Sequence, residues 1–369
     1  MDLASYFAPV QGRRVGIVGV TGAVGKEMLL CLTKRGWTPK EIKCFASERS
    51  AGGKVTIAGV EYPIYLFSVE AAQEMDVVFL AVSGDFALEH ARVIAEKTLV
   101  IDNSSALRQA DDVPLIVPEV NGLRVLSAST RLVANPNCTT AIAMMALAPL
   151  HEAFGLKRVI VSSYQATSGA GVAGMAELVS QTQVALGHHD IVETGVVPPT
   201  LLEAKTFKHP IAFNLIPHID TFQPNGYTKE EMKVTWETRK ILSLPSLPVS
   251  CTAVRIPILR AHSEAITIET ERPCPVSKAR EVLTTALGCK LVDTTESYPM
   301  PLHASGKDDV EVGRVRQSLV FGDTGLDFFV SGDQLLRGAA LNAVLIAEMV
   351  FRLQDLEHSP QNKKLRAGE

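Results

Sequence analysis

The sequence lacks the features that mark membrane, secreted and nucleic-acid-binding chains. No apolar stretch reaches the roughly 18 residues needed to cross a bilayer, and no basic N-terminal segment leads into an apolar run. The 36 basic residues do not outnumber the 40 acidic ones, and the net charge of -4 argues against nucleic acid and anionic membrane surfaces as partners. We therefore expect a cytoplasmic chain that acts on a small molecule, with a plastid or other organelle left open should a transit peptide precede it.

The six cysteines form none of the patterns that bind metal or build a disulfide scaffold. They are scattered along the chain at positions 31, 44, 138, 251, 274 and 289, with no C-x-x-C pair and no His/Cys cluster at zinc-ligand spacing. We expect no metal site and no disulfide framework, so any cysteine with a function acts singly.

What the chain does have is enough apolar material for two folded domains. It contains 369 residues, of which 46% are hydrophobic. In the first third, apolar β-branched runs at 13–19, 41–47, 76–82 and 98–105 alternate with stretches of helical periodicity at 26–37 and 86–97. This alternation predicts a Rossmann-like, doubly wound parallel sheet of the α/β class.

Beyond residue 155 the pattern changes to longer strands. Strand candidates at 157–169, 249–270 and 326–333 are separated by Pro- and Gly-rich loops, which favours an α+β domain with a mixed sheet. The apolar helix predicted over 333–353 is expected to return to the first domain. We assign residues 1–137 and 334–358 to a cofactor-binding domain, 138–333 to a catalytic and dimerisation domain, and 359–369 to a polar tail.

A glycine-rich turn follows the first predicted strand. Gly19, Gly22 and Gly25 stand at three-residue spacing before a helix, where the backbone can approach a pyrophosphate and the helix N-terminus offers free N–H groups. The spacing departs from G-x-G-x-x-G, and a purely structural tight turn is the alternative. After the second strand, Ser47, Arg49 and Ser50 outweigh Glu48 and favour the 2′-phosphate of NADP, against the alternative of a solvated turn.

Cys138 is predicted to lie in the first turn of a helix, after the turn "NPN". The positive end of a helix dipole lowers a thiol pKa, whereas a buried packing role is the alternative. A two-unit depression raises the thiolate fraction about 25-fold at pH 7, but the accompanying loss of nucleophilicity leaves a gain of only about threefold. A reactive Cys138 therefore needs partners that position the substrate and stabilise an oxyanion, for which the N–H groups near Asn137 and Cys138 are natural donors.

The motifs, taken together, resemble those of the aspartate-semialdehyde dehydrogenases. The similarity rests on "GVTGAVG", "ASERSAGG", "VIDNSSALR", "VPEVN", "NPNCTT", "SYQATSGAG", "NLIPHID", "EEMKVTWETRKIL", "VRIPILRAHSEA" and "GAALNAVLIAE", which span residues 15 to about 348. The resemblance implies reversible, NADPH-dependent reductive dephosphorylation of L-4-aspartyl phosphate to L-aspartate 4-semialdehyde through a cysteine thioester. That reaction serves the biosynthesis of lysine, threonine, methionine and isoleucine.

The same resemblance implies the catalytic and substrate-binding residues. Cys138 matches the nucleophile, His262 the general acid/base, for which a pKa near neutrality is suited, and Gln165 the residue that orients the intermediate. The substrate and phosphate are implied to contact Arg255, Glu230, Lys233, Asn103 and Arg108. From spacing we expect Arg255 and His262 on opposite faces of one strand, with a turn or bulge at Pro257 bringing both to one site.

The implied cofactor contacts come from both parts of the chain. They are Gly19, Thr21, Gly22, Ala23, Val24, Gly25, Ser47, Arg49, Ser50, Ser83, Gly84, Ser168, Gly169 and Gln334. Gln334 departs from the family pattern, which has asparagine there; the amide is one methylene longer, and this puts the geometry of a contact to the nicotinamide carboxamide in doubt.

Three alternatives stand beside this interpretation: two related enzymes and one protein of a different class. N-acetyl-γ-glutamyl-phosphate reductase uses the same chemistry but has N-P-G-C-Y at its cysteine, and phosphorylating glyceraldehyde dehydrogenases have A-S-C-T-T, whereas this chain has "NPNCTT". A non-catalytic paralogue should have lost Cys138, Arg255 or His262, and all three are present. We expect a homodimer, or a homotetramer built as a dimer of dimers.

Overall fold

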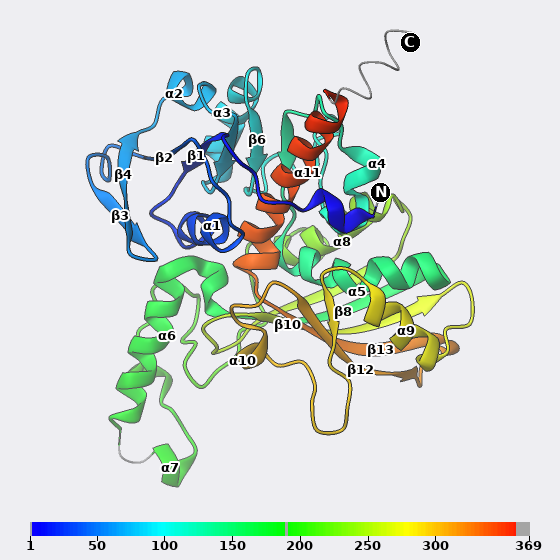
Figure 1. The fold of residues 1–369 in the computed structure, drawn as a ribbon. Helices are drawn as coiled ribbons and strands as arrows, with labels where there is room; N and C mark the ends of the chain where they lie inside the picture. The colour runs from blue at the N-terminus through cyan, green and yellow to red at the C-terminus, as the bar shows by residue number, and fades with distance from the viewer. Residues whose placement is uncertain (1, 189–190, 359–369) are drawn as a thin grey trace, which may run out of the picture. The chain divides into compact units, whose positions relative to one another are not determined.

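The computed structural model describes residues 2–188 and 191–358, and the chain divides into two compact units (Figure 1). Within the described residues, the first unit contains residues 2–137, the segment Lys240–Ser243, and residues 338–358. The second unit contains Cys138–Arg239 and Leu244–Arg337. The polar tail predicted over 359–369 lies outside the described residues.

The first unit is built on a seven-stranded sheet in the order β3-β4-β2-β1-β5-β6-β7. All neighbouring strands are parallel except β3 and β4, so the predicted doubly wound architecture is confirmed. The strands are β1 (Arg14–Val18), β2 (Glu41–Ala46), β3 (Lys54–Ile57), β4 (Val60–Leu66), β5 (Val77–Leu80), β6 (Leu99–Asp102) and β7 (Leu132–Ala134). The helices α1 (Ala23–Lys34), α2 (Val69–Gln73) and α3 (Gly84–Ala95) connect them.

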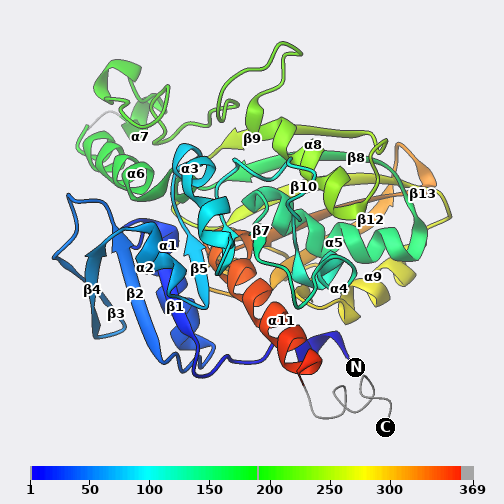
Figure 2. The same ribbon diagram turned by 90° about the horizontal axis from the view of Figure 1, so that it is seen from above.

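The long C-terminal helix α11 (Leu341–Glu357) belongs to this first unit, as expected from its apolar sequence (Figure 2). It packs against α1 and β6. Its buried Glu348 accepts from Arg35 Nε and Nη2 at 2.7 and 2.6 Å and from Trp37 Nε1 at 2.7 Å. Burial raises the pKa of Glu348, an effect that Arg35 and Trp37 oppose. This hydrogen-bonded pair fixes the helix to the segment that follows α1.

The second unit contains a six-stranded sheet in the order β11-β12-β13-β10-β8-β9. Its strands are β8 (Leu156–Gln165), β9 (Val249–Arg255), β10 (His262–Thr270), β11 (Cys289–Leu291), β12 (Val310–Ser318) and β13 (Gly322–Gly332). The β8/β9 and β11/β12 pairs are parallel and the other three pairs are antiparallel. The expected mixed sheet is therefore confirmed.

Helices α5 (Cys138–Phe154) and α9 (Val276–Thr285) contact the second sheet and each other. Most of α5 is buried, in keeping with a sequence that is apolar on every side, and it contacts β8, β10, β12 and β13. Helices α6 (Gly171–Leu186) and α8 (Lys229–Leu242) are the other long helices of this part. The short helices are η1 (Leu3–Tyr6), η2 (Pro118–Gly122), α4 (Leu123–Val125), η3 (Thr167–Ala170), α7 (Ile191–Thr194), η4 (Pro199–Leu201), α10 (Pro301–Ala304) and η5 (Leu336–Ala340).

No helix among the described residues is long and apolar enough to cross a membrane. Across 2–188 and 191–358, no group of three or more His, Cys, Asp and Glu side chains is arranged to hold a metal ion.

Candidate active site

Cys138 is the first residue of α5 and the start of the second unit. Its side chain is partly exposed, whereas Cys31, Cys44, Cys251 and Cys274 are buried. A thiolate in the first turn of a 17-residue helix gains from the N–H groups and the dipole at that end. The helix therefore presents this sulfur, unlike those four, at its electropositive end.

Gln165, the last residue of β8, lies next to the start of α5. Its buried Nε2 donates to Thr139 Oγ1 at 2.8 Å and to Ser163 Oγ at 3.2 Å, and it lies 3.3 Å from Glu230 Oε1. Thr139 follows Cys138 directly, so this contact ties the amide to the helix turn that carries the thiol. An amide held this way has a fixed orientation toward its neighbour.

Thr139 and Ser163 were missed by the sequence analysis. Ser163 precedes Gln165 by two residues, and in a strand this spacing places both side chains on one face of the sheet. That period-two signal was available in the sequence. Thr139 could have been found from its place beside the nucleophile, although its contact with a strand side chain is not visible in the sequence.

The expectation that Arg255 and His262 share one strand is wrong. Arg255 ends β9, which runs parallel to β8, and His262 begins β10, which runs antiparallel to β8. The two strands therefore flank β8, and the chain from 256 to 261 crosses between them. Arg255 pairs with Gln165 in the register, and Ser263 pairs with Tyr164. The register thus brings Gln165, Arg255 and His262 together at one end of three adjacent strands.

The ring of His262 is fully buried and held from one side. The backbone N–H of Ala166 donates to Nδ1 at 3.0 Å, which leaves the proton of the neutral ring on Nε2. Within the described residues Nε2 has no hydrogen-bond partner. Burial lowers the pKa of His262 well below 6.5, the charge of Arg255 lowers it further, and a backbone hydrogen bond at Ala261 opposes both. A pKa near neutrality was expected; burial and the adjacent guanidinium account for the difference.

Gln334 holds the backbone that leads into His262. Ala261 has a left-handed φ of 71°, a conformation that costs a residue other than glycine about 1–3 kcal/mol. Gln334 Oε1 accepts from the Ala261 N–H at 2.8 Å, and its Nε2 hydrogen-bonds Ser168 Oγ. Both ends of this amide are therefore engaged inside the second unit. Ala261 and its hydrogen bond to Gln334 therefore set the orientation of the His262 imidazole.

Arg255 is buried beside Ala166 and Gly169. Its Nη1 donates to the Ala166 carbonyl at 2.6 Å, and its guanidinium lies 5.8 Å from the Phe207 ring centre. Burial lowers the pKa of Arg255, and the charges of Glu230 and Cys138 oppose this. A Cβ on Gly169 would lie 2.6 Å from Arg255 Nη1 and 3.4 Å from His262 Cε1. Gly169 therefore leaves room for a guanidinium and an imidazole to lie side by side.

Glu230 and Lys233, both on α8, form a charged cluster with Asp220. Lys233 Nζ lies 2.8 Å from Asp220 Oδ2 and 3.2 Å from Glu230 Oε2. Burial acts to lower the pKa of Lys233, but the two carboxylates prevail and raise it. Because Glu230 also lies beside Gln165, this cluster places one carboxylate next to the Gln165 amide, where its charge also acts on Arg255.

Asn103 and Arg108 lie in the first unit, whereas Lys233 lies in the second. Arg108 is buried, and its Nε and Nη2 donate to the carbonyls of Asn135 and Asn103 at 2.8 and 2.9 Å. Asn135 Nδ2 in turn donates to Asn103 Oδ1 at 2.9 Å. These contacts connect Asn103 and Arg108, both of which are predicted to bind the phosphate. That Lys233 binds the same phosphate stays a prediction.

The glycine loop lies between β1 and α1. Gly19 has a φ of 87°, and a Cβ there would overlap the Ala81 carbonyl oxygen; a Cβ on Gly25 would overlap the Gly19 carbonyl oxygen. Gly22 occupies the N-cap position of α1 but has no side chain that could hydrogen-bond to the first turn. Added atoms at Gly22 meet only the Gly19 oxygen, at 3.4 Å. A helix N-terminus with no side-chain cap, and with space for a ligand to approach its backbone N–H groups, fits a pyrophosphate.

The other predicted cofactor residues divide between the units. In the first unit Thr21 is exposed while Ala23 and Val24 are half-buried at the start of α1, and Ser47, Arg49 and Ser50 lie in the turn after β2. Ser83 caps α3 by accepting from the Phe86 N–H at 3.4 Å, and Gly84 is the first residue of that helix. In the second unit Ser168 and Gly169 lie in η3, with Gln334 bonded to Ser168.

Two family models of known proteins match this chain, one in each part of the sequence. Residues 14–128 match the family model "Semialdehyde dehydrogenase, NAD binding domain", and residues 147–337 match "Semialdehyde dehydrogenase, dimerisation domain". The chain is 43% identical to the aspartate-semialdehyde dehydrogenase of Aquifex aeolicus, over 92% of this chain and 98% of that one. It is 42% identical to the Bacillus subtilis enzyme of the same name, over 93% and 99% of the two chains.

The chain belongs to the aspartate-semialdehyde dehydrogenase family. A crystal structure of aspartate semialdehyde dehydrogenase II from Vibrio cholerae is 38% identical, with a TM-score of 0.84 over 93% of this chain and 99% of that one. The protein is thus an oxidoreductase that acts on an aldehyde group with a nicotinamide cofactor. Its reaction is the reductive dephosphorylation of L-4-aspartyl phosphate to L-aspartate 4-semialdehyde, in the aspartate pathway of amino-acid biosynthesis.

Proposed function

We propose that Cys138 is the acyl acceptor of this reaction, and that Gln165, Arg255 and His262 are its partners. The observation that carries the proposal is their convergence at one end of β8, β9 and β10, with Gln165 bonded to the residue after Cys138. The thiolate attacks the acyl carbon of aspartyl phosphate, the C–O bond to phosphate breaks, and phosphate leaves with the electron pair. The product of this step is a thioester on Cys138.

His262 is proposed to hydrogen-bond to the carbonyl oxygen of the bound acyl group. In the neutral ring held by Ala166, Nε2 carries the proton and donates a hydrogen bond. Reduction of the thioester places negative charge on the former carbonyl oxygen, and the Nε2–H of His262 stabilises that charge with a hydrogen bond. The nicotinamide, when bound, supplies the hydride equivalent. Collapse of the oxyanion to the aldehyde then breaks the C–S bond and restores the thiolate.

Arg255 and Glu230 recognise the amino-acid part of the substrate. The buried guanidinium of Arg255 can donate two hydrogen bonds to the α-carboxylate, and Glu230, which also contacts Gln165 and Lys233, is assigned to the α-amino group. Asn103, Arg108 and Lys233 are proposed to bind the phosphate. In this arrangement side chains of the protein bind the charged groups at both ends of the substrate, and this holds the acyl carbon at Cys138.

NADP is the proposed cofactor. The loop of Gly19, Gly22 and Gly25 is proposed to bind the pyrophosphate, with Thr21, Ala23 and Val24 beside it and Ser83 and Gly84 on the adjacent turn. Ser47, Arg49 and Ser50 lie after β2, where the adenosine ribose is expected. Arg49 is exposed and, within the described residues, takes part in no ion pair. Ser168, Gly169 and Gln334 are assigned to the nicotinamide end, with Gln334 acting through Ser168 and Ala261.

A homodimer, or a dimer of dimers, is the proposed assembly. The family model that matches residues 147–337 describes a dimerisation domain. On the sheet face opposite to that of Gln165 and His262, Ile160 is 46% exposed, and the partly exposed rings of Tyr164 and Phe329 lie 6.2 Å apart. A sheet face that exposes apolar and aromatic side chains suits pairing with a second copy. A monomeric mass at micromolar concentration would contradict this assignment.

The catalytic proposal is tested by mixing the protein with aspartate semialdehyde, NADP and phosphate. We expect sustained NADPH formation only when phosphate is present, with at most one NADPH per chain in its absence, and Cys138→Ala to abolish both signals. Cys289→Ala is the matched control, because Cys289 is another partly exposed cysteine of the second unit, and it should retain full activity. Activity that persists in Cys138→Ala would overturn the proposal.

A further inference from the structure

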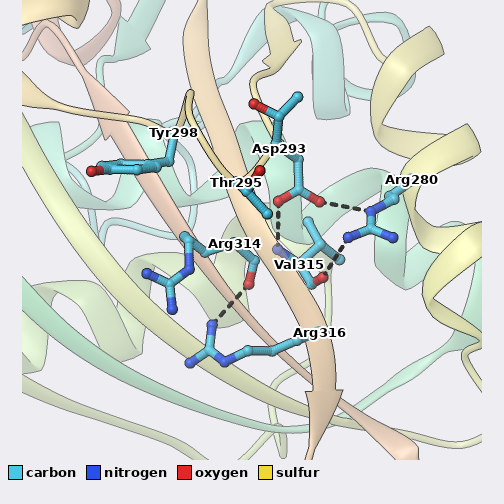
Figure 3. Close-up of a pocket in the computed structure, with 8 residues that line it drawn as sticks. Arg280, Asp293, Thr295, Tyr298, Arg314, Val315 and Arg316 are labelled. Atoms are coloured by element: carbon cyan, nitrogen blue, oxygen red, sulfur yellow. Dashed lines mark hydrogen bonds and ion pairs between the residues drawn. The ribbon is translucent and has the colours of Figure 1, made fainter.

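A hollow lies in the second unit, on residues that the proposed reaction does not use. Its volume is about 700 Å³. It is lined by Arg280, Asp293, Thr294, Thr295, Tyr298, Arg314, Val315 and Arg316 (Figure 3). Three of these side chains are guanidinium groups and one is a carboxylate, so the lining carries an excess of positive charge.

The single lining carboxylate is already engaged. Asp293 Oδ2 pairs with Arg280 Nε at 2.7 Å, and Asp293 Oδ1 accepts from the Val315 N–H at 3.2 Å. Arg280 Nη2 also donates to the Val315 carbonyl at 3.1 Å. The Asp293 side chain is only 7% exposed, so these contacts neutralise it and leave little of it open to a ligand. Arg314 and Arg316 therefore dominate the charge that the hollow presents.

Arg314 is directed into the hollow by a strained backbone. Its φ is 54°, in the left-handed region, and it lies in an irregularity of β12 between Gly313 and Arg316. Strain of this kind persists only where surrounding contacts hold it, and here the bonds of Asp293 and Arg280 to Val315 do so. Within the described residues, the Arg314 guanidinium takes part in no hydrogen bond or ion pair. The strand thus keeps an unfavourable backbone conformation that presents a guanidinium with no protein partner.

Arg316 lies next to Arg314 and adds a second cation. Its Nη1 donates to the Arg314 carbonyl at 2.8 Å, and its nearest carboxylate oxygen, on Asp327, is 3.9 Å from Nη2. Figure 3 shows both guanidinium groups on the same side of the hollow, with the Tyr298 ring above Arg314. Two adjacent guanidinium groups repel each other unless an anion lies between them, and phosphate oxygens match their planar donor geometry.

We propose that this hollow is a binding site for a small dianion that carries a phosphate group, held between Arg314 and Arg316. The site is separate from Cys138 and its partners and goes beyond the proposed function. Arg280 lines the hollow but is paired with Asp293, which offsets its charge, so Arg314 and Arg316 supply the net positive charge. The hydroxyls of Thr295 and Tyr298 are available to the uncharged part of a phosphate monoester. Inorganic phosphate and a phosphate monoester share the chemistry that the site recognises.

The test is calorimetric titration of the full-length protein with inorganic phosphate, and in a second arm with glycerol 3-phosphate. With inorganic phosphate we expect two sites per chain, one in the reaction site and one in this hollow. A greater affinity for glycerol 3-phosphate at the hollow would identify a monoester as the preferred source. Equal affinity, or a preference for inorganic phosphate, would identify the free ion. Succinate, a dicarboxylate, is expected to bind at least tenfold more weakly.

Arg314→Gln and Arg314→Gly are the decisive variants, since glycine accepts the left-handed backbone and keeps the fold while it removes the guanidinium. Both should lose the hollow's site, with at least a tenfold fall in affinity, and keep the other. Lys278→Gln is the matched control, because it removes one positive charge from exposed surface of α9 outside the hollow, and it should keep both. Unchanged binding in both Arg314 variants, or a side chain of a second copy between Arg314 and Arg316 in a phosphate-soaked crystal, would overturn the proposal.

Discussion

The backbone N–H of Ala166 and Nδ1 of His262 are joined by a 3.0 Å hydrogen bond. This bond fixes which ring nitrogen carries the proton, because an N–H that points at Nδ1 opposes a second proton there. The same residue, through its carbonyl, accepts from Arg255 Nη1 at 2.6 Å. One peptide segment after β8 therefore sets both the tautomer of the imidazole and the place of the guanidinium that acts on its pKa.

Arg255→Gln is expected to raise the pKa of His262. The folded-state pKa lies well below 6.5 because of burial first and the Arg255 charge second, so removal of that charge moves the pKa upward while burial still holds it down. The ring then becomes protonated at a higher pH, and the acid-side fall in kcat moves to higher pH. NMR titration of the imidazole and the pH profile of kcat measure this together.

The same variant should raise KM for aspartate semialdehyde about 10- to 100-fold, the size expected for loss of a charge-assisted contact. Arg272→Gln is the control, because Arg272 is an exposed arginine of the second unit that bonds only carbonyls. An unchanged acid limb and an unchanged KM in Arg255→Gln would show that this guanidinium neither touches the substrate nor acts on His262.

Gly169→Ala is expected to lower kcat/KM about tenfold or more with little loss of stability. The added methyl would lie 2.6 Å from Arg255 Nη1 and must displace that guanidinium, whose misplacement disturbs substrate orientation. Gly187→Ala is the matched control, because a Cβ there meets only atoms at 3.4 Å or more and the backbone is right-handed helical. Equal activity in the two variants would contradict the role given to Gly169. Initial rates and thermal unfolding separate the two effects.

Gly22→Ala and Gly25→Ala are expected to differ in kind. A Cβ on Gly25 would overlap the Gly19 carbonyl, so this variant should lose about 1–3 kcal/mol of stability. A Cβ on Gly22 meets only one atom, at 3.4 Å, so that variant should fold normally and bind NADP more weakly, because the methyl stands where a pyrophosphate approaches. Urea unfolding and fluorescence titration with NADPH distinguish the outcomes, and normal cofactor affinity in Gly22→Ala would contradict the loop assignment.

Glu264→Gln is expected to stabilise the protein at high pH. Glu264 lies two residues after His262, is fully buried, and within the described residues neither carboxylate oxygen has a hydrogen-bond partner. Burial raises its pKa well above 4.5, so the folded chain keeps the proton while the unfolded chain loses it. Wild-type stability therefore falls as pH rises above about 4.5, by up to ~1.4 kcal/mol per pH unit until the folded-state pKa is reached.

The glutamine variant does not titrate, so its advantage should be small at pH 4.5 and should grow toward pH 8. Glu281→Gln, at an exposed position of α9, controls for loss of a carboxylate. Denaturant unfolding at both pH values measures the difference. A Glu264→Gln variant that is less stable than wild type at pH 8 would mean that the carboxylate is ionised and paired in solution.

Much of the first unit could be predicted because its strands are buried on both faces and its turns carry glycine. The apolar runs at β1, β2, β5 and β6 stand out for this reason, and Gly19 and Gly25 are required by close backbone approach. The hairpin of β3 and β4 was missed. Its residues are largely exposed, and Pro63 interrupts the pattern, so it lacks the apolar signal of the inner strands.

The candidate site was harder to predict because it depends on strand order. Arg255 and His262 are seven residues apart in sequence, yet they reach one site because β8 is inserted between their strands. No local pattern encodes that insertion. The low pKa of His262 likewise depends on burial and on the charge of Arg255, and the sequence of one strand indicates neither. By contrast, the place of Cys138 at the start of a helix follows from the turn before it and the apolar run after it.

Intact-mass spectrometry of the protein mixed with aspartate semialdehyde and NADP, without phosphate, tests the central claim most directly. Oxidation then leaves the acyl group on the enzyme with no phosphate to remove it. We predict a mass increase of one aspartyl group per chain, mapped by peptide digestion to Cys138, absent in Cys138→Ala and lost when phosphate is added. An aspartyl group on another residue, or NADPH formed with phosphate while no acyl-enzyme is ever detected, would contradict the account.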